Sequence, residues 1–245
     1  MIEIKTANDI KIIKEGAVLL KKILKRTAKK VQPGITTNDL NQFAEELILK
    51  SGAQPAFKGY ENFPKTLCVS LNSTIVHGLP SEYQLKEGDI ISLDLGIFFK
   101  GFYSDMAITL GVGKVPPLVQ RLIKVTKKAL RIAISSAKPR KTFGDIGYAV
   151  EKYVNSQGFN VIRDLCGHGI GRELHEDPKI LNYGEKGTGP KIKEGMVFCI
   201  EPMVSLGDWH IKKSSDGFGW ETIDGSLSAH FEAMVAINRN SSIVL

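Results

Sequence analysis

The sequence predicts an α+β fold of two related halves, each a helix pair followed by antiparallel strands. The first observation is a repeated triplet. Lys-Glu-Gly precedes an acidic residue at the same spacing in KEGDIISLD, which ends at Asp94, and in KEGMVFCIE, which ends at Glu201. The second is a set of positions that recur at constant spacing: Pro33, Thr36, Asp39, Leu40, Glu45 and Gly52 recur as Pro139, Thr142, Asp145, Ile146, Glu151 and Gly158. We therefore expect one domain over residues 1–245, with halves of about 1–112 and 113–245.

Two amphipathic helices are predicted in the first half. Thr6 caps the first helix with Asp9 at its third position, and apolar residues follow at helical spacing until Pro33 ends it. Thr37 begins the second helix, which ends near Gly52. The second half repeats this arrangement with helices at 118–135 and from Thr142 to about Gly158. Both helix pairs are expected to pack on the back of a sheet.

A hairpin with two carboxylates is predicted after the first helix pair. Residues 90–93 and 107–110 have the apolar pattern of two buried strands, and 96–101 would form the turn between them. Asp94 and Asp105 would then face each other. A single aspartate is often a solvated strand-end residue, but burying two carboxylates together costs several kcal/mol unless a cation or proton compensates them. The second half repeats the pattern with Glu201 and Glu232, so the four carboxylates predict a cation site.

Aromatic residues gather in a loop-rich segment between residues 53 and 80. Phe57, Tyr60 and Phe63 stand among glycines and prolines, where no helical or strand periodicity explains them. Loop aromatics of this kind often line a pocket. A glycine-rich stretch at 214–220 is predicted to be a flexible loop that can lie over a site.

Histidines occupy two further unusual segments. His77 follows the strand-like CVSLNSTIV, and alone it would be as consistent with a buried core histidine. His168 and His175 lie in CGHGIGRELHEDP, which fits neither a helix nor a strand as a whole. The simpler interpretation of this second segment is a surface turn with incidental histidines.

Composition restricts the class of protein. Hydrophobic residues make up 42% of the chain and charged residues 24%, which is typical of a globular protein. The apolar runs are shorter than a membrane span and MIEIKTAND lacks a signal-peptide core, so we expect a cytoplasmic protein. Cys68, Cys166 and Cys199 have spacings that favour reduced thiols.

The chain carries a formal net charge of +7, and a basic cluster lies at residues 21–30, KKILKRTAKK. A basic helix face is usually solvated surface, and contact with nucleic acid is the alternative. No nucleic-acid-binding motif accompanies the cluster, so we expect docking and no sequence-specific recognition.

The chemistry follows from five residues: Asp94, Asp105, His168, Glu201 and Glu232. Four carboxylates and one imidazole are too acidic for a single zinc ion and suit two harder divalent ions, such as manganese or ferrous iron. Two such ions close together polarise a carbonyl and activate water. The residues therefore predict metal-assisted hydrolysis.

Five segments, in order, resemble the type I methionine aminopeptidases: NFPKTLCVSLNSTIVHGLP, DLG with YSDMA after it, GHGIGRELHEDP, GMVFCIEPM and SLSAHFEAM. The resemblance runs from about Ile2 to the C-terminus and fits the short bacterial form without an N-terminal extension. It implies the pita-bread fold, a curved and mainly antiparallel sheet backed by helix pairs. It also implies release of the N-terminal methionine from nascent proteins when the second residue is small.

The resemblance also implies roles for individual residues. Asp94 would bind one ion, His168 and Glu201 the other, and Asp105 and Glu232 would bridge the two. The metals accepted by such sites are manganese, iron, cobalt and zinc. Glu201 would help to move the proton of the attacking water, His175 would stabilise the oxyanion, and His77 would contact the scissile amide. The substrate-binding residues implied are Tyr60, Phe63, Cys68, His77, Leu174, His175 and Phe218.

The chain departs from the family pattern at several positions. Phe57, Leu174 and Phe218 differ at the rim of the pocket. His230 stands where glutamine is usual and Ala233 where histidine is usual, and we expect both to act on Glu232 through its surroundings.

Two other functions are the alternatives for a chain of this fold. A proline-specific aminopeptidase or dipeptidase of the same fold generally carries an additional N-terminal domain. A metal-free relative that binds protein or RNA would have lost ligands that are present here. The remaining expectations are a monomer and transient docking on the ribosome through residues 21–30.

Overall fold

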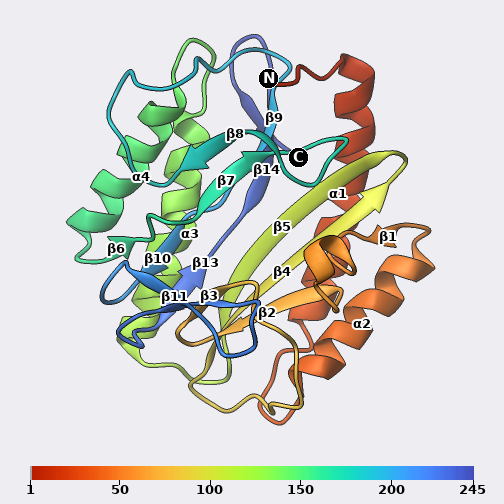
Figure 1. Ribbon diagram of the computed structural model, residues 1–245, viewed down its shortest axis with the longest axis vertical. Helices are drawn as coiled ribbons and strands as arrows, with labels where there is room; N and C mark the ends of the chain where they lie inside the picture. The colour runs from red at the N-terminus through yellow and green to blue at the C-terminus, as the bar shows by residue number, and fades with distance from the viewer. Residues whose placement is uncertain (1) are drawn as a thin grey trace.

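The computed structural model describes residues 2–245, and within them four α-helices flank a central set of strands (Figure 1). Helices α1 (Ala7–Ala28) and α2 (Thr37–Lys50) lie on one side of the molecule. Helices α3 (Pro117–Ser136) and α4 (Phe143–Ser156) lie on the other side. The α+β fold of paired helices and antiparallel strands is the one that the sequence predicted.

Capping boxes explain where three of these helices begin. The side chains of Thr6, Thr36 and Thr142 each accept a hydrogen bond from the backbone N–H of an aspartate three residues later, and that aspartate pairs back to the cap. This exchange satisfies N–H groups that a helix start leaves free. The predicted starts are confirmed, while α1 ends at Ala28, before the expected stop at Pro33.

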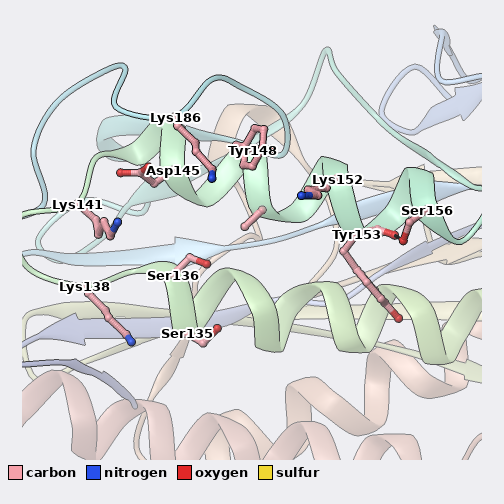
Figure 2. Close-up of a pocket in the computed structure, with 11 residues that line it drawn as sticks. Ser135, Ser136, Lys138, Lys141, Asp145, Tyr148, Lys152, Tyr153, Ser156 and Lys186 are labelled. Carbon is pink, nitrogen blue, oxygen red and sulfur yellow. Dashed lines mark hydrogen bonds between the residues drawn. The ribbon is translucent and has the colours of Figure 1, made fainter.

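The outer faces of the helices are basic. A groove between the end of α3 and the length of α4 is lined by Lys138, Lys141, Lys152 and Lys186 (Figure 2). The Nζ atoms of Lys152 and Lys186 lie 5.9 and 4.9 Å from the centroid of the Tyr148 ring.

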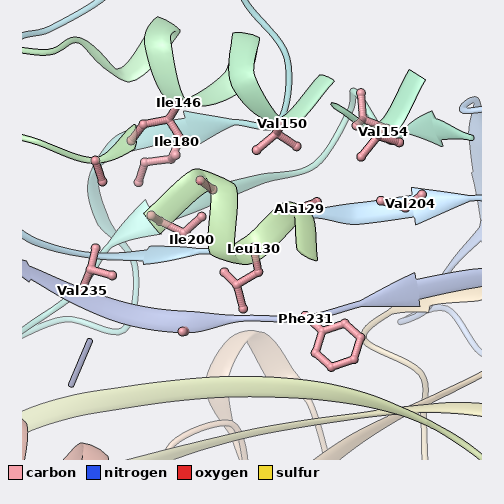
Figure 3. Packing of buried hydrophobic residues seen from close by; sticks show 14 of the residues in the cluster. Ala129, Leu130, Ile146, Val150, Val154, Ile180, Ile200, Val204, Phe231 and Val235 are labelled. Atoms are coloured by element: carbon pink, nitrogen blue, oxygen red, sulfur yellow. The ribbon is translucent and has the colours of Figure 1, made fainter. Parts of the chain in front are cut away.

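The buried faces of the helices pack on the strands. Under α3 and α4, Leu130, Ile146 and Val150 meet strand residues such as Ile200 and Val235 (Figure 3). A separate cluster forms where α1 and α2 pack on the first-half strands. Burying apolar surface at about 25 cal/mol per Å² is the main stabilising contribution of both clusters. Each helix pair therefore backs its own strands, as expected from the sequence.

The first-half strands form an antiparallel sheet in the order β1-β4-β2, with β5 paired to β4. Their bounds are β1 (Gln54–Pro55), β2 (Leu67–Leu71), β4 (Ile90–Phe99) and β5 (Phe102–Gly111). The predicted turn over residues 96–101 was wrong, because the ladder continues to Phe99↔Phe102 and leaves only residues 100–101 as the turn. Lys100 and Gly101 both have positive φ, of 51° and 86°, which closes this tight connection.

The second-half strands form a five-stranded sheet in the order β15-β14-β9-β7-β8. Their bounds are β7 (Cys166–Gly169), β8 (Glu176–Leu181), β9 (Val197–Ile200), β14 (Ala233–Ile237) and β15 (Ser242–Val244). The segment 166–178, expected to be neither a helix nor a strand as a whole, forms β7, a loop and the start of β8, and the pairing register shifts between His168 and Gly169. Its glycines hide the strand pattern from a reading of periodicity.

Two three-stranded sheets complete the fold, in the orders β13-β10-β6 and β11-β12-β3. Their bounds are β3 (Thr74–Val76), β6 (Asn160–Val161), β10 (Met203–Ser205), β11 (Ile211–Lys213), β12 (Trp220–Thr222) and β13 (Ser228–His230). A 3-10 turn, η1, spans Tyr60–Asn62. None of the helices in residues 2–245 has the length and apolar character needed to cross a membrane.

The halves of the chain meet along β5. The backbone N–H of Glu232 donates to the carbonyl of Ala107 at 2.9 Å, and the N–H of His230 donates to Thr109 Oγ1 at 2.9 Å. Thr109 Oγ1 in turn donates to the carbonyl of His230 at 2.6 Å. These bonds bring the acidic residues of the two halves together.

Candidate functional site

The five residues predicted to bind metal line a single cavity of about 250 Å³ between the two halves. Asp94 lies in the middle of β4 and Asp105 on β5. His168 lies on β7, Glu201 directly follows β9, and Glu232 connects β13 to β14. The long-range pairing of these strands, and not closeness in sequence, brings the five side chains together.

Asp94 and Asp105 do not face each other directly, contrary to the sequence prediction. In the ladder Asp94 is opposite Ala107, and Asp105 is opposite Gly96. Since partners across a ladder share a face, both carboxylates still lie on the same face as diagonal neighbours. An oxygen from each of Asp94, Asp105 and Glu232 falls in a group whose atoms all lie within 4.8 Å of one another.

His168 presents one nitrogen to the acidic residues. Its Nδ1 lies 2.9 Å from the carbonyl oxygen of Gly169, which fixes the proton on Nδ1. The lone pair of Nε2 therefore points to the carboxylates, 3.7 Å from Glu201 Oε1 and 3.8 Å from Glu232 Oε1. A backbone carbonyl that holds the other imidazole nitrogen is the usual support of a metal-binding histidine.

The acidic cluster is electrostatically uncompensated. Burial, together with the charge of neighbouring carboxylates, raises the pKa of Asp94 and Glu232 well above the usual range. Burial raises the pKa of Asp105 to about 7 and that of Glu201 to about 8. Asp94 Oδ1 and Glu232 Oε1 are buried and find no hydrogen-bond partner in the described part of the chain. Buried oxygens of this kind need a cation or a proton, so the residues fit a pair of divalent ions.

The aromatic wall of the cavity is also in place. Phe63 and Phe218 meet edge to face at 5.5 Å between ring centroids. Tyr60 Oη lies 2.9 Å from Nδ1 of His175. The structure places every residue that the resemblance assigned to substrate binding around this cavity: Tyr60, Phe63, Cys68, His77, Leu174, His175 and Phe218. Phe57 joins them, and the absence of a side chain at Gly96 leaves room for its ring.

His77 and His175 open into the cavity as neutral imidazoles. Desolvation by the surrounding protein lowers the pKa of His77 to about 4 and also lowers the pKa of His175. The backbone of His77 has a φ of 57°, and the next residue must be glycine, since a Cβ at Gly78 would lie 2.2 Å from the carbonyl oxygen of Val69. The chain therefore maintains an unfavourable backbone conformation to place this imidazole.

The loop that carries Phe218 is anchored by residues that sequence reasoning missed. Asp216 Oδ1 accepts hydrogen bonds from the backbone N–H groups of Phe218 and Gly219, both at 2.8 Å. Lys213 Nζ donates to the carbonyl of Phe218 at 2.9 Å. The sequence showed only a glycine-rich stretch, because a side chain that bonds its own loop has no periodic pattern.

Two more residues near the acidic cluster were not recognised from the sequence. Glu61 lines the cavity, and Cys199 Sγ lies within 4.8 Å of ligand atoms of His168 and Glu232. Burial and the neighbouring carboxylates raise the pKa of the Cys199 thiol well above its usual range.

His230 contacts a different carboxylate from the one expected. Its Nε2 lies 3.4 Å from Glu201 Oε2, whereas the departure in sequence suggested an effect on Glu232. The side chain is 1% exposed. Proximity in sequence to Glu232 was misleading, because β13 ends at His230 and Glu232 lies in the connection that leads to β14.

A cavity of about 390 Å³ adjoins this site and shares His77, His168, His175 and Glu201 with it, whereas two grooves between helices have different chemistry. The groove between α3 and α4 has a volume of about 530 Å³, and its lining contains lysines, tyrosines and serines with a single carboxylate, Asp145 (Figure 2). A groove of about 580 Å³ between α1 and α2 is likewise basic. Neither contains an imidazole in its lining, so the smaller acidic cavity is the candidate active site.

Comparison with known proteins identifies the family. Residues 11–239 match the model of metallopeptidase family M24. The chain is 44% identical to methionine aminopeptidase from Clostridium perfringens over 245 residues, covering 100% of this chain and 98% of the relative. It is 40% identical to methionine aminopeptidase 1 from Bacillus subtilis, covering 100% and 99%.

Solved structures give the same result. Methionine aminopeptidase from Thermotoga maritima superposes with a TM-score of 0.98 at 43% identity, covering 100% of this chain and 98% of that one. Prolidase from Pyrococcus furiosus, at 24% identity and a TM-score of 0.79, covers 98% of this chain and 64% of its own, and shows only a shared fold. The chain belongs to metallopeptidase family M24 and, within it, to the methionine aminopeptidases.

Proposed function

We propose that this chain removes the N-terminal methionine from nascent proteins and peptides when the second residue is small, by two-metal-assisted hydrolysis of the amide. The observation that carries the proposal is a cluster of three buried carboxylates and the part-buried Glu201 in an otherwise largely apolar cavity, with no hydrogen-bond partner for Asp94 Oδ1 and Glu232 Oε1 within residues 2–245. Membership of the methionine aminopeptidases supports the choice of substrate.

In this proposal Asp94 would hold one ion, His168 and Glu201 would hold the other, and Asp105 and Glu232 would contact both. Manganese, iron, cobalt and zinc all suit these ligands, and availability in the cell selects among them. When bound, the two ions supply a Lewis acid for the scissile carbonyl and lower the pKa of the attacking water.

The side chains of the cavity would do the rest. The carboxylate of Glu201 accepts the proton of the attacking water and later returns it to the departing amine. Since Nδ1 of His175 is 2.9 Å from Tyr60 Oη, its Nε2 remains free to donate to the developing oxyanion. His77, neutral at pH 7, would hydrogen-bond the scissile amide.

The first residue of the substrate would enter the aromatic part of the cavity. Rings of Tyr60, Phe63 and Phe218 and the thiol of Cys68 suit a flexible thioether, which gains packing and sulfur–aromatic contacts there. Crowding beside the carboxylates would leave space only for a small second residue.

Peptide cleavage tests the proposal. Metal-stripped protein is mixed with Met-Ala-Ser or Met-Lys-Ser, with and without manganese or ferrous iron, and free methionine is measured. We expect metal-dependent release from the alanine peptide only. Release without metal, or equal release from both peptides, would overturn the proposed chemistry or the small-residue rule, respectively. Cleavage of Xaa-Pro dipeptides in preference to Met-Ala-Ser would instead favour the proline-specific alternative.

Docking on the ribosome is the proposed link to nascent chains. The lysines of residues 21–30 are all exposed, on the last turns of α1 and directly after its end, so the cluster is available to a polyanion. Charge reversal of Lys21, Lys22, Lys25 and Lys29 should reduce co-sedimentation with ribosomes, while reversal of the exposed Lys11 and Lys14 on the same helix should not. Unchanged co-sedimentation of the first variant would exclude this surface.

The protein would act in the cytoplasm as a monomer. All five proposed ligands come from one chain, so a second copy is not needed to complete the site. Size-exclusion chromatography with light scattering would test this expectation, and a stable dimer would contradict it.

A further inference from the structure

Buried beside the acidic cluster is an imidazole that the proposed chemistry does not use. His230 is 1% exposed, and neither Nδ1 nor Nε2 has a hydrogen-bond partner among the described residues. Leaving a buried polar group without a partner costs about 1–3 kcal/mol. The partner to consider is therefore the nearest group that could accept a hydrogen bond from this imidazole.

The backbone holds this imidazole in one place. His230 is paired with Met203 across β10 and β13, and Met203 follows Glu201 by two residues. Thr109 bonds both the N–H and the carbonyl of His230, and its own hydroxyl lies 2.7 Å from Ser92 Oγ. Strand pairing and this hydroxyl chain fix the imidazole beside the start of β10.

The nearest acceptor is one particular oxygen of Glu201. Nε2 of His230 lies 3.4 Å from Oε2, while Oε1 of the same carboxylate lies 3.7 Å from Nε2 of His168. The two oxygens therefore face different imidazoles. The distance of 3.4 Å is slightly beyond an ordinary N–H···O bond, and a small rotation of either side chain would close it.

We propose that His230 is a positioning residue, which donates Nε2–H to Oε2 of Glu201 and leaves Oε1 free to bind the metal shared with His168. This inference rests on the proposed role of Glu201 as a ligand. By holding one oxygen, His230 keeps the carboxylate from rotating and separates metal binding by Oε1 from proton transfer at Oε2. Hydrogen-bond donors behind metal ligands typically change metal affinity or activity 10–100-fold.

Substitutions of His230 can be matched by the distance of their amide nitrogen from Cα. The amide nitrogen of glutamine is as many bonds from Cα as Nε2 of histidine, whereas that of asparagine corresponds to Nδ1. His230→Gln therefore keeps a donor at the required reach. His230→Asn keeps an amide but places it too far back, and His230→Leu removes the donor while filling the volume.

The experiment measures manganese affinity and kinetics. Metal-stripped protein is titrated with Mn²⁺ and the free ion is followed by electron paramagnetic resonance; kcat and KM are then measured with Met-Ala-Ser. We expect His230→Leu and His230→Asn to weaken the binding of manganese and to lower kcat, each about 10-fold or more, with KM little changed. His230→Gln should recover most of both. Wild-type behaviour of His230→Leu, or a failure of His230→Gln to recover, would overturn the proposal.

A second measurement needs no substitution. Two-dimensional ¹H–¹⁵N spectra of the histidine side chains, recorded on the wild-type protein with diamagnetic zinc, report which nitrogen carries the proton. The proposal requires the Nε2–H tautomer for His230, and an Nδ1–H tautomer would contradict it. A wild-type protein that releases no methionine would count against the proposed function, while this tautomer would still decide the role of His230.

Discussion

The two halves of the molecule carry equivalent carboxylate pairs on differently built strands. In the first half Asp94 and Asp105 lie within one continuous hairpin, whose strands β4 and β5 pair from Ile90↔Gly111 to Phe99↔Phe102. In the second half Glu201 follows the end of β9 and Glu232 precedes the start of β14. The strand after Glu201, β10, and the strand before Glu232, β13, pair with each other in a different sheet.

The two halves therefore hold their carboxylates with different rigidity. The continuous hairpin holds two short aspartates rigidly, while the interrupted one uses longer glutamates at strand ends. The interruption also makes room for imidazoles: His168 and His230 approach Glu201 from two sides. We infer that the first half mainly provides fixed ligands and the second half provides the groups that move protons.

The largest effect is expected from a substitution of Glu201 in the second half. Glu201→Gln should lower kcat by roughly 10²–10⁴-fold with metal supplied, because it removes both a ligand oxygen and the proposed proton acceptor. Glu194→Gln, an exposed residue of the repeated triplet, is the matched control and should be silent. Thermal unfolding followed by circular dichroism should show that Glu201→Gln remains folded. Substantial turnover by this variant would contradict the assigned role.

The second prediction concerns metal removal and pH. Asp105 and Glu201 have pKa values raised to about 7 and about 8, from ordinary values of 3.8 and 4.5. Above about pH 6.5 the metal-free native state therefore binds more protons than the unfolded state, and its stability falls as the pH rises. Below that pH the buried histidines oppose this effect, because burial lowers the pKa of His77 to about 4 and those of His168 and His230 to about 3. In EDTA the Tm should be several degrees lower at pH 8 than at pH 5.5, since about 1 kcal/mol moves Tm by 2–4 °C in a protein of this size.

Manganese should reverse this loss at pH 8, because the ions replace the protons. Glu201→Gln, which has one fewer buried carboxylate, should show a smaller dependence on pH. A Tm in EDTA that rises from pH 5.5 to 8 would mean that the carboxylates are already compensated by the protein.

The third prediction concerns Phe57, which the first half contributes to the pocket. Phe57→Cys should change the preference for the first or second substrate residue by about 10-fold while leaving kcat for the best peptide nearly unchanged. Comparison of kcat/KM over Met-Ala-Ser, Met-Val-Ser and Leu-Ala-Ser measures this. Phe98→Cys, on β4 of the same half but outside the lining of the cavity, is the control. Unaltered selectivity would mean that Phe57 does not contact the substrate.

The smallest effects are expected at the helix caps, which allow the two halves to be compared away from the site. Thr36 and Thr142 cap α2 and α4 with the same capping box. Thr36→Ala and Thr142→Ala should each lower the free energy of unfolding by about 1 kcal/mol in urea titrations, with activity preserved. A much larger loss at one position would show that the two halves depend unequally on their helix pairs.

Local patterns in the sequence were sufficient for the helix starts and for singling out the carboxylates and histidines that the structure brings together. Capping boxes and apolar spacing fixed the helix starts, because these signals act over a few residues. The four carboxylates were conspicuous because acidic residues are rare within buried strands. The resemblance then supplied roles that spacing alone does not provide.

Features that depend on pairing were harder to predict. The diagonal placement of Asp94 and Asp105 follows from the register of β4 and β5, which a sequence does not display. The partner of His230 depends on how β10 and β13 pair, and the anchoring of Phe218 depends on Asp216 within its own loop. Each of these is a tertiary contact without a periodic signal.

Anomalous diffraction from crystals containing manganese would test the central claim most directly. The account predicts two manganese peaks about 3.5–4 Å apart between the two carboxylate pairs, with His168 and Glu201 on one ion and Asp94 on the other. A single peak held by one half alone, or peaks outside the acidic cavity, would contradict the conclusion that both halves build one dinuclear site.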